Sequence, residues 1–397
     1  MAGLPLDYRE RGRCAADHLR HQATAAAEGE VDRAMRRIGI LTSGGDCPGL
    51  NAVIRAVVKT ACGVYRAEVI GIHDGFDGLL PGGKTRRLTP DDTQGLLVLG
   101  GTVLATTNRG PFHLGPDGDP VAEALPAFQA AVQTYERLGL DCLIAVGGDG
   151  SLRIARAIQR MGANLVGVPK TIDNDLAATD RTFGFDTAVA VASEALDRLH
   201  TVAVAHHRIM VCEVMGREAG WIALNAGLAS GADAILIPEI PFRYEPLFGM
   251  VAERRARGRN YSLVVVAEGA FPVHGQPVFQ AEGRLGGIGE VVGAEMARRT
   301  GVETRVTVLG HVQRGGTPTA YDRVLASRFG EAAVHLAARG GYGRMTALRG
   351  DDIVDVSLDE AVSCYKLVPV DGQLVRLARS TGVYFGDEPA PVLPPEF

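Results

Sequence analysis

The segment that decides the fold reads R-I-G-I-L-T-S-G-G-D-C-P-G-L-N and spans residues 37–51. Its first part is the short apolar run Ile38–Leu41, its middle is rich in glycine, and a helical pattern follows from Leu50 to Ala61. Glycines let backbone N–H groups approach an anion closely, and the N-terminus of a helix adds positive potential. The segment therefore indicates a phosphate-binding loop or, in the simpler interpretation, a tight turn between a strand and a helix.

Strand and helix patterns alternate along most of the chain beyond this segment. Strands separated by helices of ten or more residues predict parallel sheets that are covered on both faces. The alternation falls into two blocks, so we expect an α/β protein with two doubly wound, largely parallel-sheet domains and ligand sites at the carboxyl ends of strands. A helix is expected from Leu152. The apolar runs that indicate strands lie at residues 68–73, 142–146, 165–168, 209–214, 234–237, 263–267 and 306–309.

Length and charge limit the classes of protein to which the chain can belong. With 397 residues it is long enough for two packed cores, and its net charge of −5 argues against nucleic-acid binding, which needs a basic face. No run approaches the roughly 18 apolar residues of a membrane span, and the charged N-terminus does not resemble a signal peptide. The six cysteines form no C-x-x-C pair, which favours reduced thiols in a cytoplasmic enzyme over a zinc site or a disulfide framework.

Residues 1–36 are rich in Ala, Arg and Glu and have little apolar periodicity. We expect them to form a poorly ordered N-terminal extension without a role in chemistry. Met35 lies directly before the first strand, so we hypothesise that the native protein starts there.

A second glycine-rich segment, Gly147–Ser151, reads G-G-D-G-S and again lies between an apolar strand and a helix. Its glycines leave room for a nucleotide phosphate, and Asp149 offers the hard oxygen ligand that Mg²⁺ prefers. The motif also occurs in NAD kinases and lipid kinases. By itself it indicates a site for a phosphate donor and no particular acceptor.

The third segment reads P-K-T-I-D-N-D, residues 169–175, and follows the expected strand that ends at Val168. Asp173 and Asp175 are two residues apart in a loop and can face one pocket, where one carboxylate accepts a proton while the other orients it or binds a metal. An Asx-turn explains the same letters, because Asp and Asn favour such loops. Both interpretations stand at this point.

Two further segments place cationic side chains beside glycines at the end of an apolar strand. One runs from Arg208 to E-V-M-G-R at residues 213–217, and the other runs from Arg305 to G-H-V-Q-R-G-G at residues 310–316. Arginine side chains match phosphate oxygens with two parallel hydrogen bonds, so both segments are candidate phosphate sites. A solvated charged face is the alternative interpretation.

One segment matches the sequence pattern of a phosphate-binding P-loop but lacks the structural context that such a loop needs. Residues 78–85 read G-L-L-P-G-G-K-T and fit the pattern G-x-x-x-x-G-K-T. A working loop of this kind needs a strand directly before it and a helix that begins at the Lys-Thr pair. The expected strand ends near His73, and Arg86–Pro90 leaves no room for the helix, so we interpret the match as chance.

Taken together and in this order, the five segments closely resemble the phosphofructokinase family. The similarity extends from about Ile38 to at least Gly343, and P-K-T-I-D-N-D followed by M-G-R and G-H-V-Q-R-G-G is very specific. The resemblance implies a 6-phosphofructokinase, a cytoplasmic transferase of glycolysis. Such an enzyme moves the γ-phosphoryl group of ATP to O1 of fructose 6-phosphate and gives fructose 1,6-bisphosphate.

The resemblance also implies that the active site lies in the cleft between the two domains. The domain for ATP and Mg²⁺ would comprise residues 37–184 and 313–363. The domain for fructose 6-phosphate would comprise residues 185–312 and 364–390.

The donor would bind to residues of the first two segments and of one further loop. Asp149 would be the Mg²⁺ ligand. Asn108 and Arg109 stand where bacterial ATP enzymes usually carry an arginine, and we expect Arg109 to serve the phosphates. The donor-binding residues are then Gly45, Asn108, Arg109, Gly148, Asp149, Gly150 and Ser151.

Within this family the chemistry belongs to the third and fourth segments. Asp173 would be the general base that takes the proton from the 1-hydroxyl group, with Thr171 lining the same site. Asp175 would support the geometry of metal and phosphate, and Arg217 would steady the transferring phosphoryl group. The further residues expected to contact the sugar phosphate are Ile172, Met215, Gly216, Glu268, His311, Val312, Gln313 and Arg314.

Two arginines imply an oligomer. In this family Arg208 and Arg305 match arginines that reach the site of a neighbouring subunit. We therefore expect a homodimer or a homotetramer.

Two positions separate ATP from inorganic diphosphate as the donor in this family. Diphosphate enzymes carry Asp at the position of Gly150 and Lys at the position of Lys170, whereas well-known bacterial ATP enzymes have Gly at both. Gly150 favours ATP, because an Asp side chain there would intrude on the α-phosphate, while Lys170 excludes neither donor. A diphosphate-dependent phosphotransferase is the alternative.

Proteins of other classes fit fewer of these features. A Rossmann oxidoreductase needs G-x-G-x-x-G after the first strand, and Ser43–Gly49 lacks that spacing. An NAD or lipid kinase has no reason to carry G-H-V-Q-R-G-G. A non-catalytic sugar-phosphate sensor should have lost Asp149, Asp173 or Arg217, and all three are present.

Overall fold

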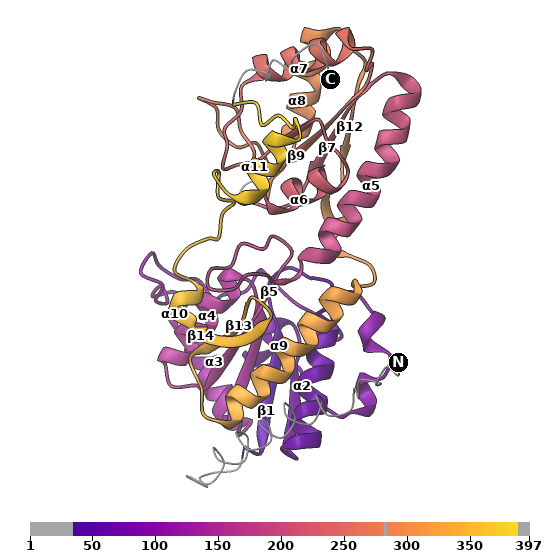
Figure 1. The fold of residues 1–397 in the computed structure, drawn as a ribbon. Coiled ribbons are helices and arrows are strands. Elements are labelled where there is room, and N and C mark those ends of the chain that lie inside the picture. The colour runs from indigo at the N-terminus through magenta and orange to yellow at the C-terminus, as the bar shows by residue number, and fades with distance from the viewer. Residues whose placement is uncertain (1–34, 282–283, 388–397) are drawn as a thin grey trace, which may run out of the picture. The chain divides into compact units, whose positions relative to one another are not determined.

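The computed structural model describes residues 35–281 and 284–387, whose strands form two main sheets with helices packed against them (Figure 1). The first sheet has the strand order β14-β13-β5-β4-β1-β2-β3, and β6 pairs with β5. Its inner strands are parallel, while β3 and β14 pair antiparallel at the two edges. These strands are β1 (Arg37–Thr42), β2 (Glu68–Ile72), β3 (Thr85–Leu88), β4 (Cys142–Gly147), β5 (Leu165–Thr171), β6 (Phe183–Gly184), β13 (Arg344–Arg349) and β14 (Asp352–Ser357).

Two long helices pack together beside β1. Helix α2 (Leu50–Val64) buries apolar residues at three- and four-residue spacing, which is the pattern of an amphipathic helix, and it lies against α9 (Ala320–Ala338). The backbones approach closely at Gly330, where a Cβ would lie 2.8 Å from the carbonyl oxygen of Val53. The helix predicted from Leu50 therefore forms, and its apolar stripe is buried.

Two other helices share a core with the same sheet. Helix α3 (Leu125–Arg137) and helix α4 (Asp149–Arg160) place Phe128 and Ile158 in one apolar cluster with Leu143 of β4. The sheet thus has packed apolar side chains on the face that these helices cover. Short 3₁₀ helices connect the elements: η1 (Gly75–Leu79), η2 (Asp91–Thr93) and η3 (Leu96–Val98).

Helix α4 begins three residues earlier than the sequence predicts. Gly148 is its N-cap residue, and the carbonyl oxygen of Gly148 accepts a hydrogen bond from Leu152 N–H at 2.9 Å. Helical bonding therefore starts inside the G-G-D-G-S motif. The first N–H groups of a helix have no partner within the helix, so the motif presents free donors.

The second sheet is entirely parallel and has the order β12-β7-β9-β8. Its core joins valines of β7 and β9 to apolar residues of α7 and α8, and its edge strand β12 is half exposed. A small antiparallel pair is formed by β10 (Phe279–Ala281) and β11 (Arg284–Leu285). The elements are α5 (Phe185–His206), β7 (Ile209–Val214), α6 (Trp221–Ala229), β8 (Ala234–Leu236), α7 (Tyr244–Ala256), β9 (Ser262–Ala267), α8 (Ile288–Thr300), β12 (Thr304–Val308) and the 3₁₀ helix η4 (Gly310–Arg314).

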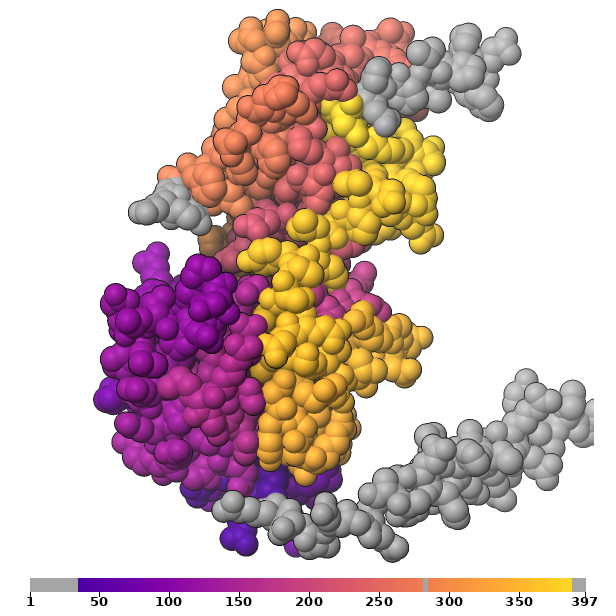
Figure 2. All heavy atoms as spheres, turned by 90° about the vertical axis from the view of Figure 1, so that its left-hand side faces the viewer, coloured from indigo at the N-terminus to yellow at the C-terminus, as the bar shows by residue number. Residues whose placement is uncertain are grey.

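A C-terminal segment, residues 364–372, connects elements that pack on different sheets. We call it the strap. It runs from α10 (Leu358–Ala361), which contacts α4, β13 and β14, to α11 (Gln373–Ser380), which contacts α6. Figure 2 shows this C-terminal part of the chain, in yellow, at the molecular surface.

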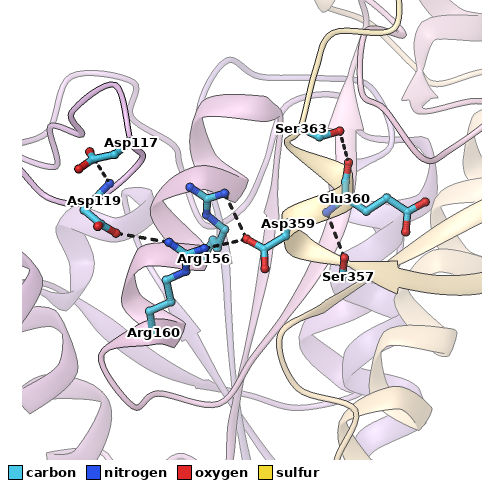
Figure 3. Close-up of polar contacts among 8 residues, drawn as sticks. All are labelled: Asp117, Asp119, Arg156, Arg160, Ser357, Asp359, Glu360 and Ser363. Atoms are coloured by element: carbon cyan, nitrogen blue, oxygen red, sulfur yellow. Dashed lines mark hydrogen bonds and ion pairs between the residues drawn. The ribbon is translucent and has the colours of Figure 1, made fainter.

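Polar contacts hold α10 against α4 just before the strap begins (Figure 3). Oδ1 of Asp359 accepts hydrogen bonds from Arg156 at 3.2 Å and from Arg160 at 2.9 Å. The hydroxyl oxygen of Ser357 caps α10 by accepting a hydrogen bond from Glu360 N–H at 3.0 Å. The amino end of the strap is therefore anchored to the helix that carries the G-G-D-G-S motif.

The predicted α/β fold class with two doubly wound units of largely parallel sheet is confirmed. Every apolar run predicted to be a strand overlaps one, although the runs 68–73, 234–237 and 306–309 each extend one residue past the strand's end. The sequence did not predict β3, β13 and β14, because these segments contain charged and polar residues and lack the continuous apolar run from which strands are predicted. Residues 85–88 form β3 instead of opening a helix, so the match to G-x-x-x-x-G-K-T is a chance one.

Some predictions fall beyond the described residues. Of the predicted extension, residues 1–36, the structure describes only Met35 and Arg36. The predicted domain boundaries stay a prediction. In residues 35–281 and 284–387, no helix is long and apolar enough to cross a membrane.

Gly184 joins β6 to α5 and leaves no room for a side chain. Its φ of +93° lies in the left-handed region, and a Cβ there would lie 1.9 Å from Sγ of Cys47. We expect Gly184→Ala to lower the free energy of unfolding by about 2 kcal/mol or more, because backbone strain and overpacking add. Gly63→Ala on α2 is the control, since nothing lies within 4 Å of a Cβ there, and it should raise the unfolding midpoint slightly. Circular dichroism on heating measures the midpoint of thermal unfolding. A midpoint for Gly184→Ala at or above that of the wild type would contradict this account.

Candidate functional site

Three of the sequence motifs meet at one edge of the first sheet. The strands β1, β4 and β5 are parallel neighbours, and the segments Ser43–Gly49, Gly148–Ser151 and Ile172–Asp175 follow them directly. The carboxyl ends of parallel strands share an edge, which is where α/β sheets bind ligands. A hydrogen bond of 2.9 Å from Ser43 N–H to Val146 O joins the first two ends.

Two cations hold the glycine-rich loop after β1. Lys170 is only 3% exposed, and its Nζ donates to the carbonyl oxygen of Gly45 at 2.5 Å. Arg314 donates from Nη1 to the carbonyl oxygen of Asp46 at 2.8 Å, and a Cβ at Gly45 would lie 2.5 Å from the same nitrogen. Burial lowers the pKa of Lys170 to about 8, so the side chain is still largely charged at neutral pH.

The loop that carries Asn108 and Arg109 is tied to the same glycine-rich segment. Gly44 N–H donates to Thr107 O at 3.0 Å, and the hydroxyl group of Thr106 donates to Gly44 O at 2.6 Å. Asn108 and Arg109 follow directly and are exposed. Their predicted contact with phosphates stays a prediction, and their position beside Gly44 is consistent with it.

The first turn of α4 presents an open face. Nothing lies within 4 Å of a Cβ built at Gly150, and Gly150 is exposed. Arg153 holds Asp149 from the following turn, since Nε donates to Oδ2 at 2.8 Å. Free N–H groups, open space and a fixed carboxylate together form a cradle that suits a phosphate chain with a divalent cation.

Three carboxylates at this edge each keep one buried oxygen without a hydrogen-bond partner. The atoms are the Oδ1 oxygens of Asp149, Asp173 and Asp175. Buried polar atoms are normally paired, so these oxygens indicate a site that a ligand completes. Among the described residues, no three His, Cys, Asp or Glu side chains are arranged to hold a metal by themselves. A Mg²⁺ ion at Asp149 would therefore take its other ligands from phosphates and water, as Mg²⁺ commonly does.

The turn after β5 brings two of these carboxylates together. Asp173 N–H donates to the hydroxyl oxygen of Thr171 at 3.0 Å, and Asn174 has a φ of +54°, which is uncommon for a residue with a side chain. Burial, followed by the charge of Asp173, raises the pKa of Asp175 to about 6. Two acidic side chains with unpaired oxygens suit proton abstraction or the binding of a cation.

The loop after β7 is shaped by Glu268, which follows β9. Oε1 of Glu268 accepts hydrogen bonds from Gly216 N–H at 3.3 Å and from Arg217 N–H at 3.0 Å. Burial raises the pKa of Glu268, the Arg217 N–H group opposes this shift, and the charge of Asp173 adds to it. The side chain of Arg217 is exposed, while its backbone φ of +52° lies in the left-handed region. Met215, also predicted to contact substrate, is partly exposed in the same loop.

The residues predicted to bind a sugar 6-phosphate divide into two groups. His311 and Val312 are exposed on η4, whereas Gln313 and Arg314 are buried. Gln313 donates from Nε2 to Gly310 O at 3.1 Å, so part of its side chain serves the 3₁₀ helix itself. Ile172 is also fully buried, and its predicted contact with substrate stays a prediction.

Arg208 and Arg305 lie away from these loops. They occur at the amino ends of β7 and β12, whereas the Met215–Arg217 loop follows the carboxyl end of β7. Both bind Glu303, Arg208 at 2.9 Å and Arg305 at 2.5 Å. Their predicted action in a neighbouring subunit stays a prediction.

A hollow of about 390 Å³ lies elsewhere, between α9 and the β13–β14 pair. Its charged lining residues are paired with one another, as Arg339 is with Asp355. None of its lining residues belongs to the motifs, so we do not connect it with the chemistry. The lining residues are Glu331, Ala332, His335, Leu336, Arg339, Thr346, Ile353, Val354 and Asp355.

Sequence reasoning missed two residues of the strap, Tyr365 and Lys366, that contact the backbone of Leu176 and Asp175. Partial burial, followed by the charge of Asp149, raises the pKa of Tyr365, and the backbone of Tyr365 forms an antiparallel bridge with Leu176. Lys366 N–H donates to Asp175 O at 2.8 Å. No motif marks this pair, because the contact depends on the path that the strap takes through the folded chain.

Comparison with known proteins gives a consistent picture along most of the chain. A family model described as Phosphofructokinase matches residues 37–337. The ATP-dependent 6-phosphofructokinase of Chloroflexus aggregans is 59% identical over 354 residues, which are 89% of this chain and 98% of that protein. ATP-dependent 6-phosphofructokinase 1 of Synechocystis sp. is 50% identical over 360 residues, or 89% and 99% of the two chains.

Solved structures agree with the fold. The phosphofructokinase of Saccharomyces cerevisiae has a TM-score of 0.73 at 32% identity, and the alignment covers 83% of this chain and 45% of the yeast chain. This chain thus spans less than half the length of the yeast chain. A pyrophosphate-dependent phosphofructokinase from Marinobacter aquaeolei has a TM-score of 0.73 at 23% identity, with 91% and 94% of the two chains covered, and this likeness concerns the fold alone.

Proposed function

The chain belongs to the phosphofructokinase family, and from this membership we propose that it is an ATP-dependent 6-phosphofructokinase. It transfers the γ-phosphoryl group of ATP to O1 of fructose 6-phosphate and releases ADP and fructose 1,6-bisphosphate. The observation that carries the proposal is the set of three unpaired carboxylate oxygens, on Asp149, Asp173 and Asp175, beside the buried cation of Lys170.

The donor binds at the first turn of α4 and the loop after β1. Backbone N–H groups of Gly148–Ser151 face the phosphates, and the open space at Gly150 accommodates the α-phosphate. Gly45 lets the phosphate chain approach the backbone, and Asn108 and Arg109 lie on the adjoining loop. Asp149, whose Oδ1 has no hydrogen-bond partner, would hold Mg²⁺, and the ion would offset the charge of the phosphates.

The acceptor is activated by Asp173. Its carboxylate takes the proton from the 1-hydroxyl group, O1 forms a bond to the γ-phosphorus, and the bond from that phosphorus to the bridging oxygen breaks. Thr171 fixes the turn that carries Asp173. Asp175 supports the metal and phosphate geometry, and Arg217 offsets the charge that spreads over the transferring group.

The far end of the sugar phosphate is held by the second sheet and η4. His311 and Arg314 bind the 6-phosphate, with Val312 and Gln313 in the same segment, while Met215, Gly216 and Glu268 contact the sugar together with Ile172. Arg208 and Arg305 complete the phosphate site of a neighbouring subunit, so the active unit is a homodimer or homotetramer. The enzyme works in the cytoplasm.

The domains follow the division of ligands. Residues 37–184 and 313–363 contain the whole first sheet and bind ATP with Mg²⁺, whereas residues 185–312 and 364–390 contain the second sheet and bind fructose 6-phosphate. The reaction takes place in the cleft between them.

Inorganic diphosphate is the competing donor, because Lys170 is the residue that diphosphate enzymes carry. Two arguments favour ATP. Gly150 leaves the space that an α-phosphate needs, and the relatives that are 50–59% identical are named as ATP-dependent.

Removing the base tests the mechanism. We expect Asp173→Ser to reduce kcat by at least about a hundredfold and to leave KM for both substrates nearly unchanged, because a positioned base accelerates the transfer without holding either ligand. Asp117→Ser makes the same chemical change on an exposed loop and should retain full activity. An aldolase-coupled assay measures both, and near-normal turnover of Asp173→Ser would remove Asp173 from this role.

Donor choice is tested at Gly150. We expect Gly150→Asp to reduce kcat/KM with ATP far more than with diphosphate, because the new carboxylate occupies and repels the position of the α-phosphate. The same coupled assay, supplied with fructose 6-phosphate and either donor, compares the two. Equal losses with both donors would contradict the steric argument.

Lys170 should appear in the pH profile of the free enzyme. Because burial lowers its pKa to about 8, the cation is present below that pH and is lost as the pH rises through it. We expect kcat/KM for ATP to fall above about pH 8, since this ratio reports groups of the unliganded enzyme. In Lys170→Met we expect kcat/KM for ATP to be lower at all pH values and to show no decline above about pH 8. If the decline persists in this variant, another group causes it.

A further inference from the structure

The strap places a partly buried ammonium group, that of Lys366, against the turn that follows β5. Nζ of Lys366 donates to Oδ1 of Asn174 at 3.0 Å, to Thr179 O at 2.9 Å and to Asp180 O at 3.0 Å. A lysine side chain has three N–H donors, so every one of them is used within the loop that follows β5. Such a set of contacts fixes the loop instead of offering a charge to solvent.

The residue that Lys366 holds lies between the two carboxylates of the proposed mechanism. Asn174 has a φ of +54°, an uncommon backbone conformation for a residue with a side chain, and its surroundings must maintain it. Its Oδ1 also accepts a hydrogen bond from Thr182 N–H at 3.1 Å. In addition, Lys366 N–H donates to Asp175 O at 2.8 Å. Side chain and backbone of Lys366 thus bind both Asn174 and the residue after it.

The strap itself is held from the second sheet. Trp221, at the start of α6, donates from Nε1 to Lys366 O at 2.8 Å, and its ring lies 5.9 Å from Nζ. Val368 N–H donates to Oε1 of Glu239 at 2.8 Å, and the same oxygen accepts from Gly220 N–H at 3.0 Å. Gly220 and Trp221 follow the loop that carries Arg217. Lys366 therefore links the turn of Asp173 to the segment behind Arg217.

We propose that Lys366 is a positioning residue for phosphoryl transfer, which sets the direction of the Asp173 carboxylate through Asn174. This inference rests on the proposed role of Asp173 as the base. All three donors of Lys366 Nζ are bonded within the protein, so its contribution is geometric. A displacement of about 1 Å at a reacting group can cost on the order of a hundredfold in rate, which gives such a residue a measurable effect.

Lys366→Met removes the three donors and keeps the length and apolar character of the side chain. We expect kcat to fall by about ten- to a hundredfold and KM for ATP and fructose 6-phosphate to change by less than about threefold. Lys84→Met is the matched control, since Lys84 is an exposed lysine outside the strap, and it should behave as the wild type. A kcat for Lys366→Met within twofold of the wild type, or a loss confined to KM, overturns the proposal.

Asn174→Gly tests the same link from the other side. Glycine tolerates the positive φ, so the backbone is retained while Oδ1 is lost. We expect a loss of kcat similar to that of Lys366→Met. The double variant should lose no more activity than the more impaired of the two single variants, because both changes break one unit. Losses that multiply in the double variant overturn the proposal. If Lys366→Met fails to fold, Asn174→Gly decides alone, and full activity of this variant counts against the link.

Fluorescence of the chain's single tryptophan separates positioning from loss of structure. Trp221 contacts the strap, so an emission spectrum of Lys366→Met close to that of the wild type, with a reduced kcat, is the expected result. A kcat that falls only in step with the folded fraction, measured by the same signal on heating, overturns the proposal. A wild-type protein without fructose 6-phosphate kinase activity would instead refute the proposed function on which the inference rests.

Discussion

The burial of negative charge is the constraint on which the site depends. Asp173 and Asp175 are 3% and 8% exposed and lie two residues apart, and a buried carboxylate is costly unless cations or donors compensate it. Two lysines whose pKa values are lowered by burial lie with them, Lys170 fully buried and Lys366 partly buried. Acids and bases that would each be unfavourable alone therefore stabilise one another, and this requires all four residues to keep their places.

The protein does not supply a hydrogen-bond partner for every buried carboxylate oxygen of the candidate site. The lysine donors are directed to backbone carbonyls and to Asn174, so one oxygen on each of Asp149, Asp173 and Asp175 is left without a partner. The protein holds the rest of the turn rigidly and leaves these atoms for ligands. A site arranged before the substrates arrive needs little reorganisation during the reaction, which is the main source of electrostatic catalysis.

Contacts between elements of the two sheets complete the arrangement. Glu268 uses a carboxylate oxygen to hold the backbone that presents Arg217, and the strap bonds to Asp175 on one side and to Trp221 on the other. These contacts have no counterpart in local sequence patterns. They hold the candidate site residues in fixed orientations although these residues lie on loops, because each loop is hydrogen-bonded to a residue of a distant segment.

The sequence by itself determined the α/β class, the strands β1, β4, β5, β7 and β9, and the loops that follow them, because strand periodicity and glycine placement are local properties. Its motifs also marked Asp149, Asp173 and Arg217 as candidate site residues. Only the tertiary structure decided that α4 begins at Asp149, that the polar edge strands β3 and β14 form, and that Lys366 lies under Asn174. These features arise from hydrogen bonds between segments far apart in the chain. The sequence of one segment does not show which distant segment it will contact in the folded protein.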